Sequence, residues 1–497
     1  MSLLRGFGFC AVLSAACLPL GCRTAKRVPV SAIQRHHDAL ALNEQDRNET
    51  ATDDEAEPGL KQVSHQASDE FVMAESIGED DPFAGMSELP LDRLIAAVQI
   101  RNPSMQAAQA AWAVAIERYP QAVSLEDPML QTMFAPASFA SNMSQSSYYL
   151  GAAQKVPWHG KRELKGQMAK WESAAASWDA EEVKLRLATA SRMAFFDYYL
   201  VRRELELNDK NVEVMQDFRG TAKTKYESNQ VSQQDLSSAD LELAKLKQQR
   251  LELKQTQRMA VARINTLLHR RPDHSLPAPP QRLTIDGEIP DSSALRDIAS
   301  RNRPELAALN ARIQSEQNAV ALACKQYYPD FEFMGRYDSF WTDAQQRPQV
   351  GMNMNVPIQR NRLAAAVREA QFKVTKLVAE YAQQMDAVNE EVEIAYARAS
   401  TNHETAALYE STILPSAQTN LDTARNAYIA GSIDFLRLME ARRQFIDQQI
   451  GYQKTLTEYQ RSRADLERAV GTSFGATDST QRYDATTIEQ LPKPISP

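Results

Sequence analysis

The pattern of apolar and polar positions between residues 89 and 471 occurs twice along the chain. Each copy begins with a short amphipathic helix that ends in Arg101-Asn102-Pro103 or in Arg301-Asn302-Arg303-Pro304, and an alanine-rich helix follows. The second copy lies about 200 residues after the first, because Gly151 to Pro157 aligns with Gly351 to Pro357 (351 minus 151). Self-similarity at this spacing indicates one structural unit built twice.

Strand character follows the alanine-rich helix of each copy, at residues 129–156 and 331–356. Residues 350–356 alternate apolar and polar side chains, which is typical of a strand with water on one face and lipid or core on the other. Each stretch is long enough for two strands and a connection. Proline then ends the strands, because it cannot donate to a sheet ladder and it suits the first turn of a helix. We therefore interpret four residues as strand-to-helix junctions: Gly151, Pro157, Gly351 and Pro357.

A long helical hairpin completes each copy. Its first arm in the first copy runs from about 161 to 227 without a proline, and the return arm reaches about 269. The return arm carries small or apolar residues every seven positions, which predicts a coiled-coil seam: Ala239, Leu246, Leu253, Ala260 and Leu267. The second hairpin returns to about residue 471, and Pro415 predicts a kink or a short break in its outgoing arm.

The turns of the two hairpins match each other residue by residue. The matched pairs are Tyr226 with Tyr428, Asn229 with Gly431 and Val231 with Ile433. Asparagine and glycine take a left-handed backbone conformation most readily, so both turns are predicted to contain one.

Composition excludes several classes of function. The net charge of -8, without a long basic run, excludes a nucleic-acid partner, and a mean hydropathy of -0.48 is too polar for a helical membrane protein. The histidines are scattered, and Cys324 is the only cysteine after residue 22, so we predict no metal site and no disulfide. Neither a phosphate-binding glycine loop nor a nucleophile with a base is found. The sequence therefore predicts a protein that is not an enzyme and has no cofactor.

The N-terminus has the pattern of a secretory signal. Arg5 precedes an apolar stretch that ends in Leu18-Pro19-Leu20-Gly21-Cys22, too short to span a bilayer. This ending resembles the lipobox of bacterial lipoproteins, in which Cys22 would be acylated after cleavage. The family usually has leucine where Pro19 stands. The alternative is an ordinary signal peptide with an incidental cysteine.

These patterns divide the chain into six parts. We expect a signal peptide at 1–21, a lipid-anchored acidic tether at 22–88, a first repeat at 89–274, a linker at 275–290, a second repeat at 291–471 and a C-terminal tail at 472–497. The tether and the tail lack sustained apolar periodicity, so they cannot bury enough surface to offset their ordering entropy.

Four strands in one chain leave two sheet edges unpaired, and long amphipathic hairpins must bury their seams. Symmetric association of several copies solves both problems. The chain resembles the TolC family of outer-membrane efflux proteins over residues 89 to 471. The features that carry this resemblance are the repeated order of helix, strand pair and hairpin, the two Arg-Asn-(x)-Pro helices, the segments Gln154 to Gly160 and Val356-Pro357, and the paired turns.

The resemblance implies a mainly α fold with a small β part. Three protomers would each give four strands to a shared 12-stranded transmembrane β-barrel, and the long hairpins would form a trimeric α-barrel in the periplasm. The hairpin turns would be the periplasmic tips, where a membrane-fusion adaptor docks. Asp235 and Glu440 fall on acidic gate positions of the family, whereas Arg437 stands where the family often has a further aspartate. The alternative is that these three are solvated surface charges.

The resulting prediction is a passive exit duct in the outer membrane, served by a periplasmic adaptor and an inner-membrane pump of the RND or ABC type. The alternative is a periplasmic adaptor or a coiled-coil structural lipoprotein without a pore. An adaptor normally has one hairpin between β-rich halves, and this chain has two. The segment Gln154 to Trp158 resembles members associated with heavy-metal export, although drug exporters share similar stretches.

Overall fold

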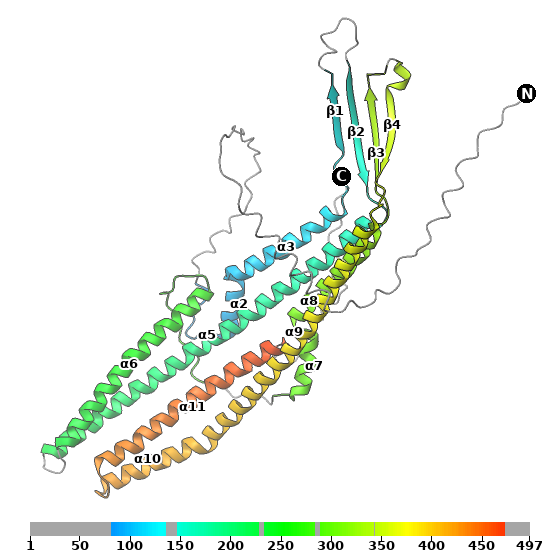
Figure 1. Ribbon diagram of the computed structural model, residues 1–497. Helices are drawn as coiled ribbons and strands as arrows, with labels where there is room; N and C mark the ends of the chain where they lie inside the picture. The colour runs from blue at the N-terminus through cyan, green and yellow to red at the C-terminus, as the bar shows by residue number, and fades with distance from the viewer. Residues whose placement is uncertain (1–80, 136–146, 228–232, 284–288, 342, 473–497) are drawn as a thin grey trace, which may run out of the picture. The chain divides into compact units, whose positions relative to one another are not determined.

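The computed structural model of the protein describes residues 81–135, 147–227, 233–283, 289–341 and 343–472. Its first repeat contains two short helices, two strands and a long hairpin: α2 (Leu91–Arg101), α3 (Pro103–Val123), β1 (Met129–Phe134), β2 (Tyr148–Val156), α5 (Lys161–Glu227) and α6 (Gln233–Leu267) (Figure 1). The second repeats this order: α7 (Ser292–Asn302), α8 (Pro304–Lys325), β3 (Phe331–Asp338), η2 (Ala344–Gln346), β4 (Pro348–Met354), α9 (Arg360–Leu408), η3 (Tyr409–Ile413), α10 (Leu414–Ile429) and α11 (Phe435–Val470). The mainly α fold with a small sheet is thus confirmed.

The two Arg-Asn-(x)-Pro segments form the corners between short helices. In the first, the Asn102 side chain accepts a hydrogen bond from the Ser104 N–H at 2.9 Å, and Pro103 occupies the first turn of α3. The Asn102 amide also donates to the carbonyl of Leu267 at the end of α6. In the second, buried Arg303 donates to Glu391 and to the carbonyl of Arg468. Each motif therefore ties its corner to the returning arm of its own hairpin.

The four strands form one antiparallel sheet in the order β1-β2-β3-β4 (Figure 1). The central pair joins the two repeats, since Val156 faces Phe331 and Gly151 faces Arg336. Strands β1 and β4 are the edges, and within the described residues each pairs on one side only. Their side chains are largely exposed, as at Val350, which is 94% exposed. The predicted strand pairs are confirmed, and both faces of β4 are largely open in one copy.

Two apolar clusters hold the helices together. The first joins α2, α5 and α6, and the second joins α7, α9 and the end of α11. Four aromatic residues of α5 are buried in or beside the first cluster: Phe195, Phe196, Tyr198 and Tyr199. The Tyr198 hydroxyl also donates to the carbonyl of Pro277. Residues of the predicted linker therefore lie against the first hairpin.

The boundary predicted for the tether is too late in the chain. Phe83 and Leu89 are completely buried in the first apolar cluster. Asp81 accepts an ion-pair hydrogen bond from Arg270 at 2.8 Å, and the Arg270 guanidinium lies over the Phe83 ring. The acidic composition of this segment led to its prediction as a tether, although its Phe83 packs into the apolar cluster. The packed part of the chain begins by residue 81, and residues 22–80 of the predicted tether lie outside the described residues.

The predicted seam holds the first hairpin together. Ala239, Leu246 and Ala260 of α6 are buried, as is Ile264 at a companion position. Ion pairs add to the apolar contact, for example between Arg250 and Asp209 at 2.6 Å. Both arms are uninterrupted helices in the described residues, and the bounds of α5 match the predicted first arm.

The second hairpin contains the break predicted from Pro415. Its outgoing arm changes at Tyr409–Ile413 from an α-helix to one turn of π-helix, and α10 follows with Pro415 in its first turn. A proline ring displaces the carbonyl four residues earlier, which explains the wider turn. Neither the π turn nor α10 has a buried residue. This lower part of the second hairpin is held by few contacts within one copy.

Candidate functional site

The strand-to-helix junctions place a buried ion pair between the two repeats. The Lys161 ammonium at the start of α5 donates to the Asp330 carboxylate and to the carbonyl of Tyr328, at 2.8 and 2.9 Å. Asp330 also accepts from the backbone N–H of Trp158, just after Pro157. Burial raises the pKa of Asp330, but these bonds outweigh burial and the net pKa lies below its ordinary value. The junction therefore fixes where the sheet meets the helices.

Gly151 and Gly351 were predicted at the strand-to-helix junctions, but they lie at equivalent points inside β2 and β4. A Cβ at 151 would lie 3.0 Å from the Cβ of Arg336 and 3.2 Å from the carbonyl oxygen of Gly335. A Cβ at 351 would lie 3.1 Å from the Cγ of Met334. Both positions therefore permit close approach to β3, although neither contributes a reactive group.

The hairpin turns lie at the ends of the helices away from the sheet (Figure 1). In the second hairpin Gly431 has the predicted left-handed conformation, with φ of 74°. Asp434 then caps α11 by accepting from the Arg437 N–H, and the Tyr428 ring packs on buried Phe435 with 6.0 Å between ring centroids. Ile433 is half-buried. In the first hairpin Tyr226 is exposed, while Asn229 and Val231 lie outside the described residues.

The three gate candidates lie in the first turns of the returning arms. Asp235 is half-buried on α6, and Arg437 and Glu440 are exposed on α11. Within one copy, the side chains of Arg437 and Glu440 have no hydrogen-bond or ion-pair partner among the described residues. Asp235 therefore lies on the first hairpin and Arg437 and Glu440 lie on the second, and their role as a gate stays a prediction.

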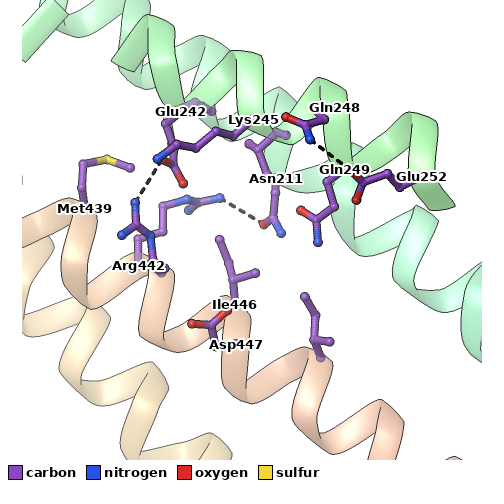
Figure 2. A pocket seen from close by; sticks show the side chains of 14 residues that line it. Asn211, Glu242, Lys245, Gln248, Gln249, Glu252, Met439, Arg442, Ile446 and Asp447 are labelled. Carbon is purple, nitrogen blue, oxygen red and sulfur yellow. Dashed lines mark hydrogen bonds and ion pairs between the residues drawn. The ribbon is translucent and has the colours of Figure 1, made fainter. Parts of the chain in front are cut away.

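A cavity of about 360 Å³ lies between the first hairpin and α11 (Figure 2). Arg442 extends from α11 into this space and donates to the Asn211 amide oxygen of α5 at 3.4 Å. Its guanidinium lies 5.4 Å from the centroid of the Phe218 ring. The Nε atom of Arg442 is buried and has no hydrogen-bond partner within the described part of the chain. Burial lowers the pKa of this guanidinium.

Neighbouring charges on the same cavity are paired. Arg443 of α11 donates to Glu242 of α6 at 3.0 Å, which links the two hairpins next to Arg442. Lys245 approaches the same carboxylate at 3.5 Å. Sequence reasoning missed this polar joint. Arg442 directly follows Ala441, which is buried, so its position beside the packed face of α11 was open to prediction. Its partner Asn211 lies on the other hairpin, and no spacing in the sequence identifies that partner.

The described residues contain no group of three or more histidine, cysteine, aspartate or glutamate side chains arranged to hold a metal ion. Among the same residues, every helix is too short or too polar to cross a membrane.

The arrangement of strand pairs and hairpins is that of known outer-membrane channels. The outer membrane protein VceC of Vibrio cholerae superposes with a TM-score of 0.65 at 18% identity, over 77% of this chain and 96% of that one. The open-state MtrE outer membrane channel of Neisseria gonorrhoeae gives 0.64 at 15% identity, over 77% and 89%. The transmembrane channel protein CusC gives 0.66 at 15% identity, over 84% and 99%. The chain therefore has the fold of these TolC-type outer-membrane channels.

The sequence itself carries the family signature in its second repeat. Residues 295–472 match the family described as "Outer membrane efflux protein". No curated protein matches the chain. The match is to the family that was predicted from the repeats, and it covers the second of them.

Proposed function

We propose that the protein is the passive exit duct of a tripartite efflux system. The observation that carries this proposal is the duplication: each repeat adds one strand pair to a single sheet and one long hairpin to the helical part. A sheet with two unpaired edges needs further strands before it can face lipid, because the backbone donors and acceptors of those edges would otherwise lack partners. The duct crosses the outer membrane with its strands, and its hairpins extend into the periplasm.

The duct is a homotrimer in which four strands from each copy close a shared 12-stranded β-barrel. Antiparallel strands at both edges make this closure sterically straightforward, because each edge exposes a full row of backbone donors and acceptors. The hairpins close a tube below it. Exposed apolar residues on helices that face away from the cores support further helix contacts between copies: Trp112, Tyr119, Phe372 and Val378.

The hairpin tips receive a periplasmic membrane-fusion adaptor, and an inner-membrane pump of the RND or ABC type supplies the substrate. Tyr226, Asn229, Val231, Tyr428, Gly431 and Ile433 form the docking turns. Asp235, Arg437 and Glu440 line the closed end, where symmetry brings like charges together and favours cations or an open state.

The decisive experiment is an export assay in a host from which the protein has been deleted. Loss of the duct should sensitise the cells to at least one metal ion or hydrophobic toxin, and the unaltered chain should restore resistance. The same screen identifies the substrate class, because the resemblance of residues 154–158 to heavy-metal exporters is shared by drug exporters. If no compound becomes more toxic after deletion, the export role is wrong.

The competing adaptor or structural lipoprotein predicts a different behaviour on extraction. A duct should be recovered from the outer membrane in detergent as a trimer that survives unheated gel electrophoresis. Recovery as a soluble monomer would favour the competitor. Acylation is tested by labelling with a radioactive fatty acid: Cys22→Ser should abolish the label, and Cys324→Ser should leave it unchanged.

The gate assignment is tested by conductance in planar bilayers. Glu440→Gln should lower the preference for cations, because it removes one charge per copy from the closed end. Glu404→Gln is the matched control, since Glu404 is also exposed and lies on α9 far from the turn. Equal selectivity in both variants would assign Glu440 to an ordinary solvated surface.

A further inference from the structure

The duplicated fold supplies a template for contacts between copies. Within one chain, the second strand and long helix of the first repeat pack against the first strand and alanine-rich helix of the second, so that β2 pairs with β3 and α5 packs on α8. The second repeat presents the equivalent elements, β4 and α9, at the other edge of the sheet. Their equivalent partners, β1 and α3, belong to the first repeat and lie at the opposite edge.

The helices show that this second contact is missing from a single copy. Helix α8 packs against both α5 and α9, whereas among the described elements α3 packs extensively on α5 and only marginally on α2. Ser315 of α8 is 7% exposed and donates to the carbonyl of Met168 on α5. Val114 stands at the same distance from the proline that begins α3 and is 57% exposed. The face that α8 buries against α5 is therefore open on α3.

The strand registers define which residues are equivalent. Ala153 aligns with Asn353 in the repeat, and these residues face Met129 and Glu332 within their own strand pairs. Met129 is therefore equivalent to Glu332. Two residues before Met129 and Glu332, Asp127 is equivalent to Asp330, the carboxylate of the buried ion pair.

The position equivalent to Lys161 lies in the first turn of α9, where Arg360 and Arg362 flank Asn361. Asp127, Arg360 and Arg362 are all exposed. Their side chains have no hydrogen-bond or ion-pair partner among the described residues of one copy. The carboxylate at one edge of the sheet and the two guanidinium groups at the other edge are complementary in charge.

We propose that β4 of one copy pairs with β1 of a second copy in the register of β2 with β3, and that Asp127 of the second copy pairs with Arg360 and Arg362 of the first. The proposal rests on the ring of copies in the proposed function and adds its residue-level contact. In this register Met352 faces Thr132 of the neighbour, as Ala152 faces Gly335 within the chain, and Asn353 faces Gln131, as Ala153 faces Met334.

Disulfide crosslinking in a Cys324→Ser background tests the register. Two chains carry facing pairs, Thr132→Cys with Met352→Cys and Gln131→Cys with Asn353→Cys. Two controls re-pair the same four substitutions as 132 with 353 and 131 with 352, where the side chains lie on opposite faces of the sheet. Adjacent facing pairs alternate in hydrogen-bonding type, so one of the two has the closer Cβ atoms that a disulfide needs.

We expect at least one facing pair to give a ladder of crosslinked bands on a non-reducing gel, ending at the size of the closed ring. The crosslinked fraction in that pair should be several-fold larger than in either control. An intact oligomer in which a control pair crosslinks best, or in which all four chains fail to crosslink, overturns the register and leaves the duct standing. Absence of any oligomer in the uncrosslinked protein overturns the duct itself.

Charge reversal tests the ion pairs separately. Asp127→Arg should reduce the crosslinked fraction of the facing pair and the amount of oligomer on an unheated gel. Combination with Arg360→Asp and Arg362→Asp should restore both, because the pairing is re-formed with opposite signs. Equal yields for the single reversal and the unaltered chain, or no recovery in the combination, contradict this contact. Lys247→Glu, which reverses an exposed charge on α6, is the matched control and should leave the yield unchanged.

Discussion

Replacing Asp330 by asparagine removes the charge from the Lys161–Asp330 pair and preserves the shape of the side chain. Lys161 is 4% exposed and Asp330 is 19% exposed. Breaking a buried pair costs about 3–5 kcal/mol when one charge is left without a partner. Lys161 keeps its bond to the Tyr328 carbonyl, and asparagine can still accept from the Trp158 N–H. We therefore expect Asp330→Asn to lower the free energy of unfolding by about 2–3 kcal/mol.

The matched control is the ion pair of Lys155 with Glu126, which lies beside the same strand ends at 3.3 Å. Both side chains are more than half exposed, so Glu126→Gln should cost at most about 1 kcal/mol. Urea unfolding in detergent gives the two free energies, and hydrogen exchange at the Trp158 amide reports the junction directly. Combining Asp330→Asn with Lys161→Met should recover part of the loss, because no charge remains buried.

The dependence on pH has a defined sign. Because the folded-state pKa of Asp330 is depressed, its stabilising contribution is present above the unfolded pKa of about 3.9 and is lost as pH falls below that value. The unaltered protein and Asp330→Asn should therefore converge in stability in acid. Equal losses for Asp330→Asn and Glu126→Gln at neutral pH, or a difference that persists in acid, would refute this account of the junction.

Three further changes follow from the local geometry and are measured as shifts in the free energy of unfolding. Gly151→Ala should cost about 1–3 kcal/mol, because its Cβ meets Arg336, whereas Gly335→Ala, with open space around it, should cost less; equal costs would contradict the close approach. Gly431→Ala should cost about 1 kcal/mol through its φ of 74°, and a neutral result would contradict the left-handed turn. Arg442→Met should be neutral or stabilising, because the buried Nε has no acceptor, and a loss above about 3 kcal/mol would reveal a partner.

Much of the fold could be predicted because short-range sequence patterns mark the elements of each repeat. Proline ends the strands, a seven-residue recurrence marks the seam, and Pro415 marks the π turn. These signals act within a few residues of the chain, so one sequence suffices to find them. The α5 bounds follow from the absence of proline over residues 161–227.

The missed features depend on contacts between distant segments. Phe83 is one apolar residue in an acidic stretch, and only its position against Arg270 shows that it is an anchor. Arg442 likewise meets Asn211 across the gap between hairpins. The sequence shows the charge of Arg442 but not its partner, because the partner depends on how the two hairpins pack against each other in the folded protein.

The same distinction explains where the two repeats have diverged. Their strands and corners keep equivalent residues, since each strand must pair in a register that both repeats share. The hairpins project beyond this common body and are free of that constraint. The first remains two uninterrupted helices around a buried seam, whereas the second has a π turn at Tyr409–Ile413 and an α10 without buried residues. Bending the second hairpin therefore breaks fewer contacts than bending the first, and we infer that shape changes at the tips are concentrated there.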